Sequence, residues 1–131
     1  GDDDPTDEEI GVFNTLFATN HAFYGFADYF LNIPVDTGGL GLRDTALKFA
    51  FFPWEQTRLT VDLHNFQTAQ DGSLSTQSLG NEFDVTLSRP ISQGLSLGAG
   101  YAYFQAKDGM EELGRLEEDA QWFYLMLNAG F

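Results

Sequence analysis

The chain has 131 residues, no cysteine and a formal net charge of -14, from twenty acidic and six basic residues. So few Lys and Arg argue against nucleic acid as a partner, because phosphate binding relies on cations that displace counterions. The lack of cysteine excludes disulfides and thiolate metal sites. No apolar run approaches the roughly twenty residues of a membrane-spanning helix, so a membrane form would have to cross as strands.

The first forty residues do not have the pattern of membrane strands. Residues 1–9 are mostly acidic, and their spacing lacks the glycine and terminal glutamate of a calcium loop, so we expect a charged loop. Aromatic residues at 23, 24, 26, 29 and 30 fit a helical period better than a strand period. Residues 33–39 contain proline and two glycines, which break regular structure. The sequence predicts a loop segment over 1–40, with a short helix or folded loop near 20–30.

From residue 41 the pattern changes to a strand period of two. Apolar residues at 47, 49, 51, at 59, 61, 63, at 83, 85, 87, at 95, 97, 99, 101, 103 and at 123, 125, 127 alternate with polar or small ones. The last stretch, 121–131, is nearly all apolar and ends on an aromatic. Such a strand promotes aggregation in a soluble domain but suits a barrel wall in lipid. The sequence therefore predicts about five antiparallel strands of an outer-membrane-type transmembrane β-barrel over 41–131.

The expected connections alternate in length. Residues 53–56 and 89–94 are short turns, whereas 68–78 and 107–119 are long polar loops. Outer-membrane barrels have short periplasmic turns and long outer loops, so segment 1–40 should lie outside the cell. The first and last strands would point the same way, which implies a partial barrel whose remaining strands come from elsewhere. A small soluble β-barrel or sandwich, with the apolar face buried as a core, stays open as an alternative.

The alternation also predicts which charged side chains face the lumen. They are Asp44, Lys48, Arg58, Asp62, His64, Glu82 and Asp84. These residues could contact a solute, or they could form a cross-strand ladder of ion pairs that stiffens the wall. Ser88 and Ser96 occur nearby, but no recognisable nucleophile motif is present. We therefore expect no enzyme activity, no catalytic residues, no cofactor and no metal site.

The loop 107–119 carries a second acidic cluster. Its members are Glu111, Glu112, Glu117, Glu118 and Asp119. The simplest interpretation is a solvated outer loop. The alternative is that calcium or magnesium bridges these carboxylates to lipopolysaccharide phosphates.

An ordered series of short stretches resembles the alginate export porin family of Gram-negative outer membranes. It runs through residues 1–5, 13–30, 42–44, 62–66, 79–84 and 98–101 to Phe131. The resemblance implies a monomeric barrel of roughly eighteen strands that passes an anionic polysaccharide or small solutes, with segment 1–40 folded over or into the mouth. It also implies contact with outer-membrane lipid and recognition by the barrel-assembly machinery, with Phe123, Leu125, Leu127 and Phe131 as the terminal signal.

The inward-facing charges depart from what a polyuronate conduit needs. Such a conduit would line its lumen with Arg and Lys, whereas the expected set here is mixed and slightly acidic. A general porin, or a conduit for a different solute, is at least as well supported. Two other functions stay open, namely a structural barrel that holds a partner protein and a soluble β module that binds a ligand.

Overall fold

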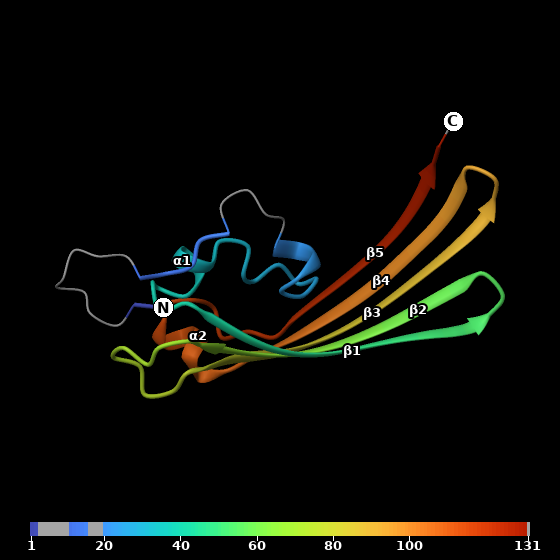
Figure 1. Ribbon diagram of the computed structural model, residues 1–131. Helices are drawn as coiled ribbons and strands as arrows, with labels where there is room; N and C mark the ends of the chain where they lie inside the picture. The colour runs from blue at the N-terminus through green and yellow to red at the C-terminus, as the bar shows by residue number, and fades with distance from the viewer. Residues whose placement is uncertain (3–10, 16–19, 131) are drawn as a thin grey trace.

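The computed structural model describes residues 1–2, 11–15 and 20–130, and these form one curved antiparallel sheet with an N-terminal segment folded onto it (Figure 1). The strands are β1 (Leu42–Trp54), β2 (Thr57–Thr68), β3 (Ser78–Ser92), β4 (Leu95–Ala106) and β5 (Ala120–Ala129), and their spatial order follows the chain. A short 3₁₀ turn, η1 (Asn20–Ala22), and the helices α1 (Ile33–Asp36) and α2 (Asp108–Glu112) complete the elements. The predicted all-β class is confirmed. The sheet of the described residues is open, with β1 and β5 as its edges.

The strands extend further into the expected turns than the sequence pattern indicates. β1 continues through Pro53 to Trp54, and β3 continues through Pro90 to Ser92. The register shifts at both prolines, as expected where a residue without an N–H lies at an irregularity of the ladder. The turns therefore shrink to residues 55–56 and 93–94, and Gln56 and Gly94 adopt the positive φ angles that such tight turns require.

Two helical turns lie where the sequence predicts none. α1 begins within the stretch expected to break regular structure, because Pro34 occupies the first turn, where its missing N–H costs nothing. α2 lies within loop 107–119. Residues 20–30 contain η1 followed by bends, which agrees with the folded loop expected there. Among the described residues, the helices are all too short to cross a membrane.

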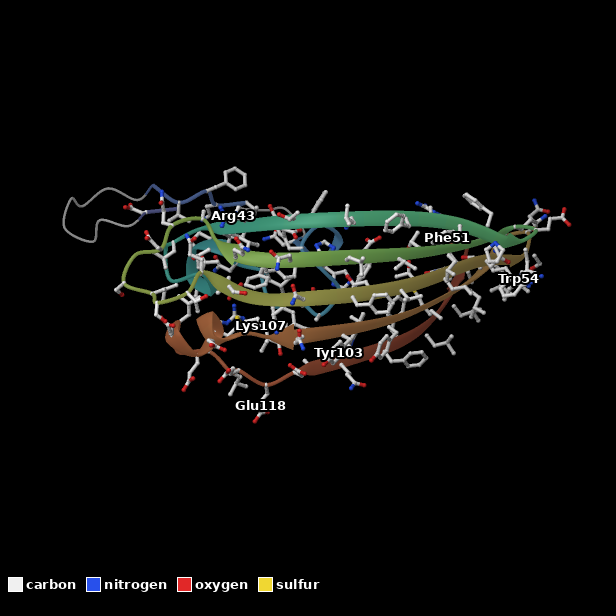
Figure 2. The ribbon with its side chains drawn as sticks, turned by 90° about the horizontal axis from the view of Figure 1, so that it is seen from below. Arg43, Phe51, Trp54, Tyr103, Lys107 and Glu118 are labelled. Atoms are coloured by element: carbon white, nitrogen blue, oxygen red, sulfur yellow. The ribbon has the colours of Figure 1, made fainter. Side chains whose placement is uncertain are left out.

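The period of two gives the sheet two chemically different faces. The convex face carries an apolar belt of exposed side chains, which are Leu47, Phe49, Phe51, Leu63, Phe83, Tyr101, Phe123, Leu125 and Leu127. Belt residues of neighbouring strands lie opposite one another, as Leu47 does with Leu63 and Leu63 with Phe83. Figure 2 views this face, with Phe51 and Trp54 at the hairpin end and Arg43 and Lys107 at the loop end.

The buried core is small and lies at the loop end of the sheet. Phe30 of the N-terminal segment packs with Phe66, Leu79 and Phe104 of the sheet and with Met110 of α2. This core lies on the concave side, beneath the segment that contains α1 in Figure 1. The apolar belt is on the opposite face and takes no part in the core, so the described residues leave it uncovered.

Candidate functional site

Four of the predicted inward-facing residues form a connected polar network on the concave face of β1 and β2. Lys48 Nζ donates to Asp62 Oδ2 at 3.0 Å and lies 3.3 Å from His64 Nε2. His64 Nδ1 lies 2.8 Å from Asp44 Oδ2. The register brings Lys48 opposite Asp62, whereas Asp44 and His64 are two residues out of register and meet on a diagonal. This geometry is that of the cross-strand ladder considered as an alternative to solute contact.

Glu82 on β3 attaches the N-terminal segment to the wall. Its side chain is almost completely buried, and Oε1 accepts a hydrogen bond from the Ala27 N–H at 2.7 Å. Gly25, at φ +84°, lies so close that a Cβ there would approach the Glu82 carboxylate to 2.5 Å. Asp84 is equally buried, and neither of its carboxylate oxygens has a hydrogen-bond partner among the described residues.

The part of the concave face nearer the hairpins is open. Arg58 lies there, in a polar groove of about 400 Å³ that Lys48, Thr60, Asp62, Thr86 and Ser88 also line. The hydroxyls of Thr60 and Thr86 are hydrogen-bonded to each other across β2 and β3. All seven predicted inward residues therefore come from one face, but Glu82 and Asp84 lie under the N-terminal segment and Arg58 lies beyond it.

Aromatic packing and one arginine hold the segment in place. Tyr29 stacks on Phe104 with ring centroids 4.0 Å apart, and Phe30 lies 4.7 Å from Phe66. Arg115, in the loop before β5, donates to the carbonyl oxygens of Tyr29 at 2.8 Å and Asp36 at 2.9 Å. Burial raises the pKa of the Tyr29 hydroxyl. Sequence reasoning missed both Gly25 and Arg115, because neither belongs to a motif or to the alternating pattern.

β5 adds aromatic rings to the concave face. The Tyr124 ring lies on Gly100 of β4, where a Cβ would be 2.1 Å from the ring, so only glycine fits beneath it. Trp122 lies beside Tyr124, with centroids 4.9 Å apart, and His21 of the segment meets Trp122 edge-on at 5.9 Å. The segment therefore contacts the wall from β2 to β5.

His64 lies between two charged neighbours of opposite sign on β1. Its Nδ1 lies 2.8 Å from Asp44 and its Nε2 lies 3.3 Å from Lys48. Within the part of the chain that the structure describes, no group of three or more His, Cys, Asp or Glu side chains is arranged to hold a metal ion. What the concave wall offers is a polar surface with mixed charge.

The proposed terminal signal lies on the opposite face. Phe123, Leu125 and Leu127 project from β5 on the convex side and are exposed, whereas Phe131 falls outside the described residues. The acidic residues 3–9 also fall outside them.

Comparison with models of known protein families, with curated proteins and with solved structures gave no match to this chain. The resemblance to alginate export porins therefore stays a prediction.

Proposed function

We propose that this chain forms part of the wall of an outer-membrane β-barrel that passes polar solutes across the outer membrane of a Gram-negative bacterium. The observation that carries the proposal is the separation of an exposed apolar belt on the convex face from charged and hydroxyl side chains on the concave face. Lipid on the outside and water on the inside require that separation.

The size of the belt supports a lipid-facing role. Its nine exposed side chains come from all five strands. Several of them lie opposite one another on neighbouring strands, as Leu63 does with Phe83 and Tyr101 with Phe123. Soluble monomers rarely expose a continuous apolar surface of that kind. The strands have 10 to 15 residues, and a tilted strand needs about nine to eleven to cross the hydrocarbon layer.

The margins of the belt fit membrane interfaces. Trp54 lies at the hairpin end, and Tyr103 lies toward the loop end, where its hydroxyl donates to Asp119 at 2.6 Å. Figure 2 shows both residues. Tyr and Trp are enriched at the two boundaries of the membrane because one end of each ring is apolar and the other can hydrogen-bond.

The open edges indicate how such a barrel would be completed. In an all-antiparallel sheet β1 and β5 run in the same direction, so two copies joined edge to edge would meet in parallel. Unpaired edge groups are not tolerated in lipid, and the known bacterial barrels are antiparallel throughout with an even strand number. We infer that an odd number of further strands pairs with these two edges.

The described part of the concave wall fits a neutral polar solute better than a polyanion. Glu82 and Asp84 lie under the N-terminal segment, and the rest of the described wall carries Asp44 and Asp62 beside Lys48 and Arg58, so fixed cations do not exceed carboxylates there. A positive wall would be needed to lower the barrier for a polyuronate. The segment over residues 20–40 covers part of the same wall at its loop end.

The proposal is tested by the intact mass of the protein extracted in detergent and measured under denaturing conditions, with single-channel recordings on the same sample. We expect a requirement for detergent, ion conductance in planar bilayers and a mass larger than the 14.6 kDa of this chain. A protein of this mass that is soluble without detergent and silent in bilayers would contradict the proposal and favour a soluble β module.

A further inference from the structure

A row of amide side chains crosses the convex face where the apolar belt ends. Arg43 donates to Gln67, and Gln67 Nε2 donates to Asn65 Oδ1 at 3.0 Å. Asn65 Nδ2 donates to Asn81 Oδ1 at 2.8 Å, and Asn81 Nδ2 lies 3.5 Å from Gln105 Oε1. We call Gln67, Asn65, Asn81 and Gln105 the amide row. It links β2, β3 and β4 and reaches β1 through Arg43, which Figure 2 shows at the loop end of the sheet.

The register places the amide row directly beside the apolar belt. Thr45, Asn65, Asn81 and Gln105 lie opposite one another on four successive strands, and Leu47, Leu63, Phe83 and Tyr103 form the next row on the same face. These eight residues line an open depression of about 500 Å³. One side of the depression is apolar and the other consists of amides and a hydroxyl.

The amides keep hydrogen-bonding capacity toward the outside. A primary amide has two N–H donors and an oxygen with two lone pairs. Asn65 and Asn81 each use one donor and one lone pair within the row, and both are partly or fully exposed. Among the described residues, each therefore keeps one N–H donor and one acceptor lone pair unused, which suits hydroxyl and amide groups of a ligand.

Charge argues against a bare phosphate at this position. The amide row is neutral, and the nearest loop carries Glu117, Glu118 and Asp119. Two cations lie at this end of the face, Arg43, which donates to Gln67, and Lys107, and they are fewer than the three carboxylates. A neutral polar head joined to apolar chains matches the depression better than an anionic group does.

We propose that this depression binds an outer-leaflet glycolipid at the junction of its sugar head and acyl chains. The sugar hydroxyl and amide groups bond to Asn65 and Asn81, and the first part of an acyl chain lies on Leu63 and Phe83. The inference rests on the proposed membrane location, because it requires the convex face to meet lipid. The continuity of the depression with the apolar belt is what brings an amphiphile, and not a soluble sugar, to this place.

The test uses the protein as extracted from its membrane, reconstituted into phosphatidylethanolamine vesicles that contain a minor fraction of lipid A, an acylated diglucosamine. After gentle re-extraction, native mass spectrometry counts the lipid A molecules retained. Asn65→Leu combined with Asn81→Leu removes the centre of the amide row. Gln121→Leu is the matched control, because Gln121 lies on neighbouring β5, opposite Tyr103, and takes no part in the row.

We expect lipid A to be retained by the parent protein and by Q121L, and to bind about tenfold more weakly to the double variant, as the loss of two hydrogen bonds implies. Retention should persist for lipid A without phosphates. Equal retention by the double variant, or loss of retention when the phosphates are removed, overturns the inference. A parent protein that inserts into the vesicles but retains no lipid A overturns the inference alone. Failure to insert into phosphatidylethanolamine vesicles, with or without lipid A, overturns the membrane proposal as well.

Discussion

The Glu82 carboxylate on β3 accepts a hydrogen bond from the Ala27 N–H at 2.7 Å, across 55 positions of sequence. Glu82 is removed from water, since it is only 2% exposed. The bond connects a backbone loop to the polar wall at the point where that wall would otherwise be open. It is a direct polar link between the segment over residues 20–40 and β3 of the sheet.

Replacing Glu82 with alanine should loosen the segment. Loss of a hydrogen bond to a carboxylate costs about 1–3 kcal/mol, and the Ala27 N–H would be left without its acceptor. We expect faster proteolysis within residues 20–40 and a larger single-channel conductance. Glu118→Ala, which removes an exposed carboxylate, is the control. Unchanged proteolysis and conductance in E82A would show that the link is unimportant.

Gly25→Ala should be more disruptive than Gly39→Ala. Both glycines have φ angles near +84°, so alanine is strained at either position. At Gly25 the added Cβ would also meet the Glu82 carboxylate, whereas at Gly39 it would meet nothing within 4 Å. We expect the free energy of unfolding to fall by about 1 kcal/mol in G39A and by clearly more in G25A. Equal losses in thermal or denaturant unfolding would contradict the close contact at Gly25.

The strands and their two faces were predictable from the sequence, because the period of two is a local property that each strand carries by itself. Leu47 and Phe49 on one side, and Lys48 on the other, are assigned by counting alone. The attachment of the N-terminal segment was not predictable in this way. Contacts such as Ala27 with Glu82, or Arg115 with Tyr29, join residues whose separation leaves no trace in a local pattern.

The candidate site was predictable as a set of residues but not as an arrangement. The seven inward-facing residues were assigned to one face, yet the sequence did not distinguish the network of Lys48, Asp62 and His64 from the covered pair Glu82 and Asp84.

The short helices were missed for a local reason. In α1 a proline that ends helices elsewhere occupies the first turn, where it is tolerated.

The contact between Ser75 and Glu112 should weaken in acid. The Ser75 N–H donates to Glu112 at 2.6 Å and its hydroxyl donates to the other oxygen, which together lower the pKa of the Glu112 carboxyl. A lowered pKa in the folded state means that the contact stabilises the fold fully above the ordinary value of 4.5 and is lost as the pH falls through the lowered value.

Proteolysis of the loop at residues 69–77 should therefore accelerate below about pH 4.5 in the parent protein. Glu112→Gln should show fast cleavage at neutral pH and little further change in acid, because its amide cannot ionise. Glu111→Gln, a neighbouring exposed position, is the control. If E112Q and the parent protein have the same pH profile, Glu112 does not hold this loop.

If the convex face meets lipid, lysine should impair folding at a convex position of β1 but be tolerated at the adjacent concave position. Phe49 belongs to the apolar belt, whereas Ala50 is exposed on the concave side. Lysine on a lipid face costs about 2–4 kcal/mol near the bilayer centre and less toward its boundaries, but a lysine in the lumen remains hydrated. We therefore expect Phe49→Lys to reduce the yield of folded protein in the outer membrane and to lower its stability to urea in vesicles. Ala50→Lys should fold normally and shift the channel toward anions, since it adds a cation to a wall on which the accessible charges otherwise balance. Equal tolerance of both substitutions would mean that the convex face does not contact hydrocarbon.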